Sequence, residues 1–192
     1  DHMTATSSTT WRAVVAALVA ATALLAPVDA GATPGADEPE LATPRVSERR
    51  VIGPASARQV VVADLDGDGR NDLATLEDRT PTSVLVRMAN GDGTFTQPDS
   101  SGIDPHTTHL GVEPGAIVLA DVVGDARPHL VAPAGAAGVD VHPNVGDGTF
   151  AAPIRTDAPA TVVEVADVAG DDHRDLVVAH DGRVAVLAGD GT

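Results

Sequence analysis

The sequence predicts an all-β protein built from repeated four-stranded antiparallel sheets. The 192 residues include 19 glycines and 14 prolines, which suits many short strands joined by turns. Outside an apolar N-terminal run, no segment shows a sustained helical period. Three related stretches begin at residues 60, 116 and 162: "VVVADLDGDGRNDLATLE", "AIVLADVVGDARPHLVAP" and "VVEVADVAGDDHRDLVVA". Internal repeats of this kind decide the architecture before any local detail does.

Each repeat predicts the same order of elements: strand, acidic loop, strand, turn, strand, "GDGTF" turn and short strand. In repeat one we expect strands at 58–63, 72–77 and 83–88. Repeated four-stranded units of this length are typical of β-propeller blades.

The repeats extend over about 46–99, 100–153 and 154–192, and an insertion at 99–115 predicts a surface loop. Propellers close with about 4–8 blades, so three repeats predict an incomplete propeller. Its unpaired strand edges favour self-association.

The N-terminus has the parts of a secretory signal peptide. Arg12 precedes an uncharged apolar run at 13–26, and Ala30 and Ala32 flank a glycine in a small-residue cleavage site. The run is short for a membrane span, which needs about 20 residues; an uncleaved anchor or a buried helix is the alternative. We assign 1–32 to a cloning scar plus signal peptide and 33–45 to a linker. We expect a secreted protein, cleaved near Ala32, with no membrane insertion.

Composition narrows the function. With 28 acidic and 12 basic residues the net charge is −16, which argues against binding nucleic acid or an anionic membrane surface. Without cysteine the chain can form no disulfide, zinc-thiolate site or cysteine nucleophile. It also lacks a G-x-S-x-G motif and a P-loop. We therefore predict that it is not an enzyme.

The first acidic loop carries the main candidate site. Asp64, Asp66, Asp68 and Asp72 occupy positions 1, 3, 5 and 9, the carbonyl of Arg70 can serve at position 7, and Gly69 supplies the turn at position 6. Ca²⁺ takes 6–8 oxygen ligands, and loops of this spacing wrap alternate carboxylates around one ion. The pattern predicts a calcium site; an acidic hairpin turn is the alternative.

The other two acidic loops have lost ligands. Repeat three keeps a weaker set: Asp167, Asp171, His173 and Asp175, with Ala169 at position 3 and Asp172 at the turn. Asp enters the left-handed region more easily than most residues. Repeat two keeps only Asp121 and Asp125, because Val123 and His129 replace the other two ligands and Ala126 replaces the glycine. His129 with the two aspartates could suit a softer metal, which is the alternative here. We expect no calcium there, and we expect His129 to be a surface histidine.

The pairing of "ADLDGDGRNDL" with "NGDGTFTQP" resembles the FG-GAP/VCBS repeat, known from integrin α-chain propellers and many bacterial secreted proteins. The resemblance covers about 50–192 in three copies. It implies a β-propeller with calcium bound in the loop between the first two strands of a blade. We expect Phe95 and Phe150, which end the "GDGTF" turns, to insert between adjacent blades.

The predicted function is that of a secreted, calcium-binding scaffold for extracellular interaction or adhesion, with an unidentified protein, matrix or glycan ligand. A carbohydrate-binding propeller is an alternative. We rank it lower because the chain after Ala32 has neither Trp nor Tyr to stack on a sugar. A second alternative is a non-catalytic accessory part of a larger secreted enzyme.

Overall fold

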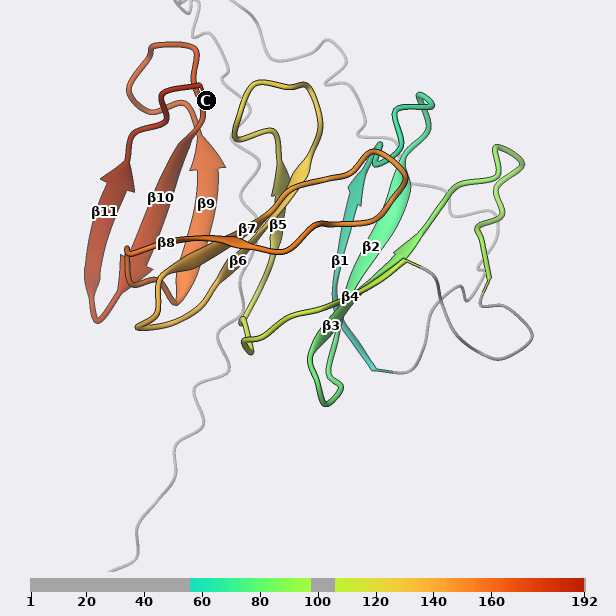
Figure 1. The fold of residues 1–192 in the computed structure, drawn as a ribbon, viewed down its shortest axis with the longest axis horizontal. Helices are drawn as coiled ribbons and strands as arrows, with labels where there is room; N and C mark the ends of the chain where they lie inside the picture. Colours follow the sequence, from blue (N-terminus) through green and yellow to red (C-terminus); the bar gives the residue numbers. More distant parts are fainter. Residues whose placement is uncertain (1–55, 98–105, 192) are drawn as a thin grey trace, which may run out of the picture. The chain divides into compact units, whose positions relative to one another are not determined.

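The computed structural model describes residues 56–97 and 106–191, which fall in a compact unit spanning Glu48–Thr192. The predicted signal peptide and linker lie outside the described residues. Within these two ranges the chain forms three antiparallel sheets and no helix (Figure 1), so it offers no helical segment that could cross a membrane. The all-β prediction is confirmed.

The strands follow one another in each sheet in chain order. The first sheet holds β1 (Ala57–Ala63), β2 (Asp72–Glu77), β3 (Ser83–Arg87) and β4 (Thr107–His109). The second holds β5 (Val118–Ala120), β6 (His129–Pro133), β7 (Val139–His142) and β8 (Ile154–Thr156). The third holds β9 (Val162–Ala166), β10 (Asp175–His180) and β11 (Arg183–Leu187). These sheets are the blades expected of an incomplete propeller.

The fourth strand of the first sheet comes from the insertion that the sequence predicted as a surface loop. β4 pairs antiparallel with β3, with Thr108 opposite Val84. Threonine has high strand propensity, and β3 offers β4 a free edge. The last strands of the first two sheets, β4 and β8, thus lie beyond residues 99 and 153, where we drew the repeat boundaries from the motifs.

A hydrophobic core fills the space between the first and second sheets. Its buried members come from both sheets and the connections between them: Leu65, Ala74, Leu76, Val84, Val86, Leu110, Ile117, Leu130 and Ala132. Phe150 packs against this core, as expected of a residue between blades. Phe95 is half-buried and belongs to neither described core cluster, so the expectation holds for one phenylalanine only.

A second core joins the second and third sheets. It holds Val131, Val139, Ala160, Val163, Leu176 and Val178. Ala160 also forms a backbone bridge with Gly135 of the second sheet, with two N–H···O bonds of 2.8 and 2.9 Å. The three sheets therefore pack as a series, each on the next.

The "GDGT" of repeat three does not take the place of the other two. Leu187 lies opposite Leu176, as Arg87 lies opposite Leu73 and His142 opposite Leu130. Counting from these pairs, Gly189 stands where Ala89 and Asn144 stand, and Gly191 matches Gly91 and Gly146. The "GDGT" segment of repeat three therefore begins two residues earlier, relative to the strand pairing, than the same segment in the other two repeats.

His142 on β7 is buried, and its Nδ1–H donates to the Ala151 carbonyl, 3.3 Å away. A carbonyl only accepts, so Nδ1 carries the proton and Nε2 holds a lone pair. Nε2 is buried with no hydrogen-bond partner. Burial lowers the pKa of His142, against smaller opposing effects of the Ala151 hydrogen bond and of Asp140.

The lowered pKa of His142 predicts a loss of stability in acid. Its folded pKa lies below the unfolded value of about 6.5, so its contribution is complete above that pH and falls as pH drops toward the folded pKa. The slope should reach at most about 1.4 kcal/mol per pH unit. Urea unfolding between pH 7.5 and pH 5 (roughly the window of His titration) measures it. His142→Gln should flatten the profile, and a variant with the wild-type slope would contradict the assignment.

Candidate metal centre

The first acidic loop connects β1 to β2. Asp64 follows β1 directly, and its two carboxylate oxygens accept the N–H groups of Gly67 at 2.8 Å and Gly69 at 2.9 Å. Gly69 has a φ of +83°, which confirms the sharp turn predicted at position 6. The loop is therefore wound around the Asp64 carboxylate.

Three of the four predicted carboxylates converge. Asp64, Asp66 and Asp72 each offer an oxygen, and these atoms all lie within 4.8 Å of one another. Asp68 turns away from the group: its carboxylate accepts the Arg70 N–H at 2.8 Å and forms an ion pair with the Arg70 guanidinium. A metal ion would thus meet three carboxylates, and a fourth only if Asp68 left Arg70.

Asp72, the first residue of β2, is fully buried. Its carboxylate accepts the Leu65 N–H at 2.9 Å and the Ala89 N–H at 2.8 Å. Burial raises the pKa of Asp72, the two hydrogen bonds lower it, and the charges of Asp66 and Asp68 raise it further, with a raised pKa as the result. A cation in the cluster would instead favour the ionised form of Asp72 and so counteract the repulsion from Asp66 and Asp68.

In every repeat, the side chain at position 9 also accepts a hydrogen bond from a backbone N–H just after the third strand. Ala89 N–H donates to Asp72, Asn144 N–H donates to Nδ1 of His129 at 3.0 Å, and Gly189 N–H donates to Asp175 at 2.9 Å. The residue at position 9 therefore fastens the second strand to the end of the third. Sequence reasoning missed these backbone donors, and the signal that could have found them is that position 9 always carries an acceptor side chain.

The second acidic loop brings Asp121, Asp125 and His129 within 4.8 Å of one another. His129 is only 3% exposed, so the surface histidine that we expected is wrong. Its place at the start of β6, beneath the β7 turn, buries it. Burial alone would raise the pKa of Asp121, but backbone N–H donors, Ala126 and Gly124 foremost, lower it.

The donor set of this second loop does not suit a metal ion. Nδ1 of His129 accepts the Asn144 N–H, so the ring proton of the neutral form sits on Nε2, which faces Asp125 at 3.2 Å. A metal-binding histidine has the opposite arrangement, since its other ring nitrogen donates. The cluster is better described as a buried histidine that joins the start of β6 to the backbone of Asn144, with its Nε2 3.2 Å from the Asp125 carboxylate but in no hydrogen bond.

The third acidic loop does not gather its predicted ligands. Among the described residues, no group of three converging donors includes Asp167, Asp171, His173 or Asp175. Asp175 accepts the N–H groups of Gly189, Val168 and Ala169, and these bonds lower its pKa. Asp172 has a φ of +67°, which confirms that aspartate adopts the turn conformation here.

The side chain at position 7 covers the hairpin that follows β3, β7 or β11. A Cβ built on Gly91 would lie 3.3 Å from Cδ of Arg70, and one on Gly146 would lie 3.6 Å from Cζ of Arg127. In repeat three, a Cβ on Gly191 would lie 2.5 Å from the ring of His173. These contacts hold each acidic loop against its own sheet. The sequence analysis assigned only a backbone carbonyl to position 7 and did not predict this role of the side chain.

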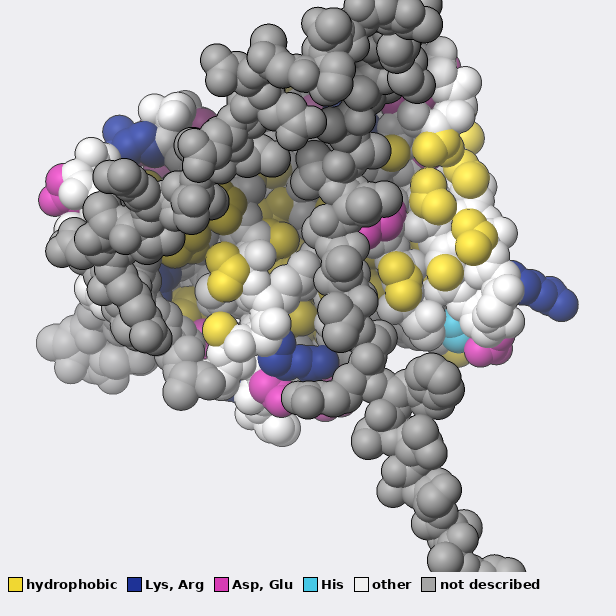
Figure 2. All heavy atoms as spheres, turned by 180° about the vertical axis from the view of Figure 1, so that it is seen from behind, with side chains coloured by type: hydrophobic (Ala, Val, Ile, Leu, Met, Phe, Trp, Pro, Cys, Tyr) yellow, Lys and Arg dark blue, Asp and Glu magenta, His cyan; other side chains and the backbone are white. Residues whose placement is uncertain are grey.

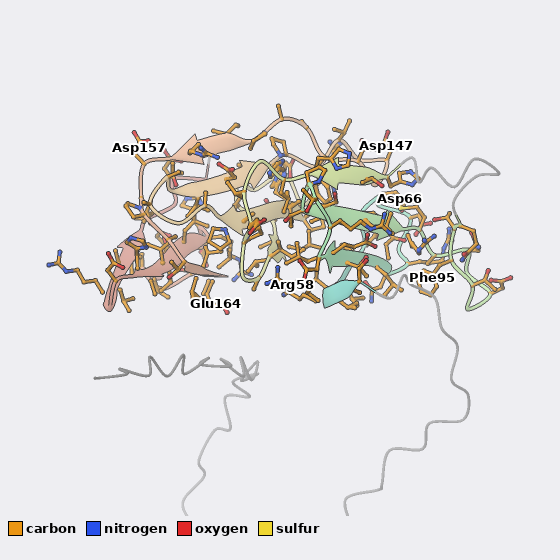
Figure 3. The ribbon with its side chains drawn as sticks, turned by 90° about the horizontal axis from the view of Figure 1, so that it is seen from below. Arg58, Asp66, Phe95, Asp147, Asp157 and Glu164 are labelled. Carbon is orange, nitrogen blue, oxygen red and sulfur yellow. The ribbon has the colours of Figure 1, made fainter. Side chains whose placement is uncertain are left out.

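A cavity of about 310 Å³ separates the first acidic loop from the second; Asp64, Asp66, Arg127 and Asn144 are among its lining residues. Asn144 spans the two repeats, because its Nδ2 donates to the Leu65 carbonyl at 3.0 Å and to the Pro128 carbonyl at 3.2 Å. Figure 3 shows Asp66 toward the first sheet, away from Asp157 and Glu164. The cavity leaves room for water at the Asp64 and Asp66 carboxylates.

The family comparison agrees with this geometry. Residues 64–132 match the family of FG-GAP-like repeats, a segment that runs from the first aspartate of the first acidic loop into β6 and so includes two of the three loops. No curated protein matches the chain. Residues 64–132 are thus similar to FG-GAP-like repeats, and the repeated antiparallel sheets agree with that similarity.

Proposed function

We propose that this chain is a secreted, calcium-binding repeat module that acts as a non-catalytic scaffold for extracellular interaction. The observation that carries the proposal is the convergence of Asp64, Asp66 and Asp72. Three carboxylates in one place are hard oxygen donors, which suit Ca²⁺ rather than a softer metal. The net charge of −16 agrees with a protein whose carboxylates meet cations.

The three carboxylates fit a structural role for the ion. Asp64 directly follows β1, and Asp72 begins β2 and holds the end of β3 through Ala89. An ion held by this group would join these strand ends and offset the burial and the neighbouring negative charges that raise the pKa of Asp72. The Arg70 carbonyl and water would supply the remaining oxygens of a shell that needs 6–8. Calcium would stabilise the first sheet.

Calcium is expected to raise the melting temperature. Extracellular modules bind it at about 10⁻⁴–10⁻³ M, so about 10 mM Ca²⁺ should add about 1.4–2.7 kcal/mol of stability. Differential scanning calorimetry with Ca²⁺ and with EDTA measures the shift. Asp66→Ala with Asp68→Ala should abolish most of it, since Asp66 is one of the three converging ligands.

The second loop supplies the matched control. Asp121→Ala with Asp125→Ala also removes two loop carboxylates, but from the cluster whose histidine is oriented against a metal. That variant should keep the calcium shift of the wild type. A wild-type melting curve that is the same in Ca²⁺ and in EDTA would disprove the calcium site.

Secretion is tested separately. The apolar run at 13–26 and the small residues before residue 33 support export, and intact-mass measurement of protein collected outside the producing cells would reveal a new N-terminus. We expect it near residue 33. A chain retained in the cell at full length would remove the secreted part of the proposal and leave the calcium site untouched.

A further inference from the structure

Each sheet has two faces with separate tasks. We call the face turned to the next sheet along the chain the leading face, and the face turned to the preceding sheet the trailing face. Between the first two sheets, Ala74 on the leading face shares a core with Leu130 on the trailing face. Between the last two, Val131 and Leu176 hold the same positions. One docking pattern is therefore used twice.

The leading face of the third sheet is exposed. Val177 of β10 lies opposite Val186 of β11 and Glu164 of β9, and the neighbouring residue pairs place Val184 and Val162 on the same face. The exposed fractions are 72% for Val184, 53% for Val186 and 48% for Val162. Figure 2 shows the resulting band of hydrophobic side chains over the third sheet. By the spacing of the repeats, Val177 is the counterpart of buried Val131.

The trailing face of the first sheet is exposed at β1. Val60 and Val62 are 55% and 57% exposed. Their counterparts in the second sheet, Ile117 and Leu119, belong to or pack against the core between the first two sheets. Phe95 is the counterpart of Phe150, which packs on that same core. Figure 3 shows Phe95 at the end of the molecule away from Glu164.

We propose that the leading face of the third sheet binds the trailing face of the first sheet in a second copy of this chain. The two exposed faces are the counterparts, position for position, of the two that already meet twice within the chain. A second copy offers each of these faces the counterpart that such a face meets within the chain. The described parts of two copies bring six sheets together, which lies within the range of about 4–8 at which propellers close, so the assembly is a head-to-tail dimer.

Glu164 sets the strength of this contact. It stands on the leading face of β9, where the first and second sheets carry Val61 and Val118. Both valines pack against cores, and a carboxylate there must lose its water on docking. Glu164→Val should therefore raise the association constant of the dimer. If this face stays exposed to solvent instead, the substitution should leave the association constant unchanged.

Two face variants test the proposal. Val184→Asp with Val186→Asp blocks the leading face, and Val60→Asp with Val62→Asp blocks the trailing face. Each variant alone has only one kind of intact face, so it can form no contact between a leading and a trailing face and should be monomeric. Mixed together, they still share one intact leading face and one intact trailing face, and a one-to-one complex is expected. Sedimentation velocity, in Ca²⁺ and in EDTA, measures all three.

Val145→Asp is the matched control, because Val145 is 55% exposed in a hairpin turn outside both faces; it should dimerise like the wild type. Far-ultraviolet circular dichroism checks that every variant is folded. A monomeric wild type whose Glu164→Val variant is also monomeric would overturn the proposal. Dimers of either blocked variant would also overturn the proposal, because they would show that a face binds the same face of another copy. None of these outcomes depends on the calcium site.

Discussion

Asp72→Ala is expected to destabilise the protein by about 2–5 kcal/mol even with no calcium present. The substitution leaves the N–H groups of Leu65 and Ala89 without their acceptor, and each unpaired buried donor costs about 1–3 kcal/mol. The raised pKa of Asp72 shows that burying its charge is itself unfavourable, which offsets part of the loss. Urea unfolding in EDTA gives the free energy directly.

Asp66→Ala separates this structural role from metal binding. Asp66 accepts only the Asp68 N–H at 3.1 Å, in an exposed loop, so in EDTA its loss should change stability by no more than about 0.5 kcal/mol. In Ca²⁺ both variants should lose the stabilisation by the ion. If the two variants cost the same in EDTA, the acceptor role of position 9 is wrong.

Leu76→Ala is expected to cost about 2–5 kcal/mol, since it opens a cavity in the core between the first two sheets. Leu76 is fully buried there, and its neighbours come from sheets that are held by strand pairing and cannot collapse freely. Equilibrium urea unfolding measures the loss. Val145→Ala, at an exposed turn position, should stay within about 0.5 kcal/mol. A cost below about 1 kcal/mol for Leu76→Ala would mean that the two sheets do not share a core.

Much of the fold and part of the site could be predicted from the sequence. The repeats predicted the strand positions, because apolar β-type residues and Asp-Gly turns act locally. The spacing of the first acidic loop predicted that Asp64, Asp66 and Asp72 would meet, because the turn at Gly69 curls the backbone whatever surrounds it. Asp172 could be predicted to take the same turn for the same local reason.

Most of the errors concern contacts between segments that are distant in the sequence. His129 is buried because the β7 turn lies over it, and no local pattern carries that information. Asp68 forms an ion pair with Arg70 and does not converge with Asp64, Asp66 and Asp72. This depends on competing side-chain interactions within one loop, which the spacing of the aspartates does not reveal. The shift of "GDGT" in repeat three becomes visible only from the pairing of Leu187 with Leu176. β4 depends on a free edge of β3, not on its own three residues.

A chain of hydrogen bonds links the first acidic loop to the second sheet: Asp72 accepts from Leu65, the Leu65 carbonyl accepts from the Asn144 side chain, and the Asn144 N–H donates to His129. Any opening of the second sheet that moves Asn144 therefore also disturbs Leu65. In amide hydrogen exchange the first two sheets should therefore open as one cooperative unit. An ion at Asp72 would therefore slow exchange well beyond its own loop, in the second sheet.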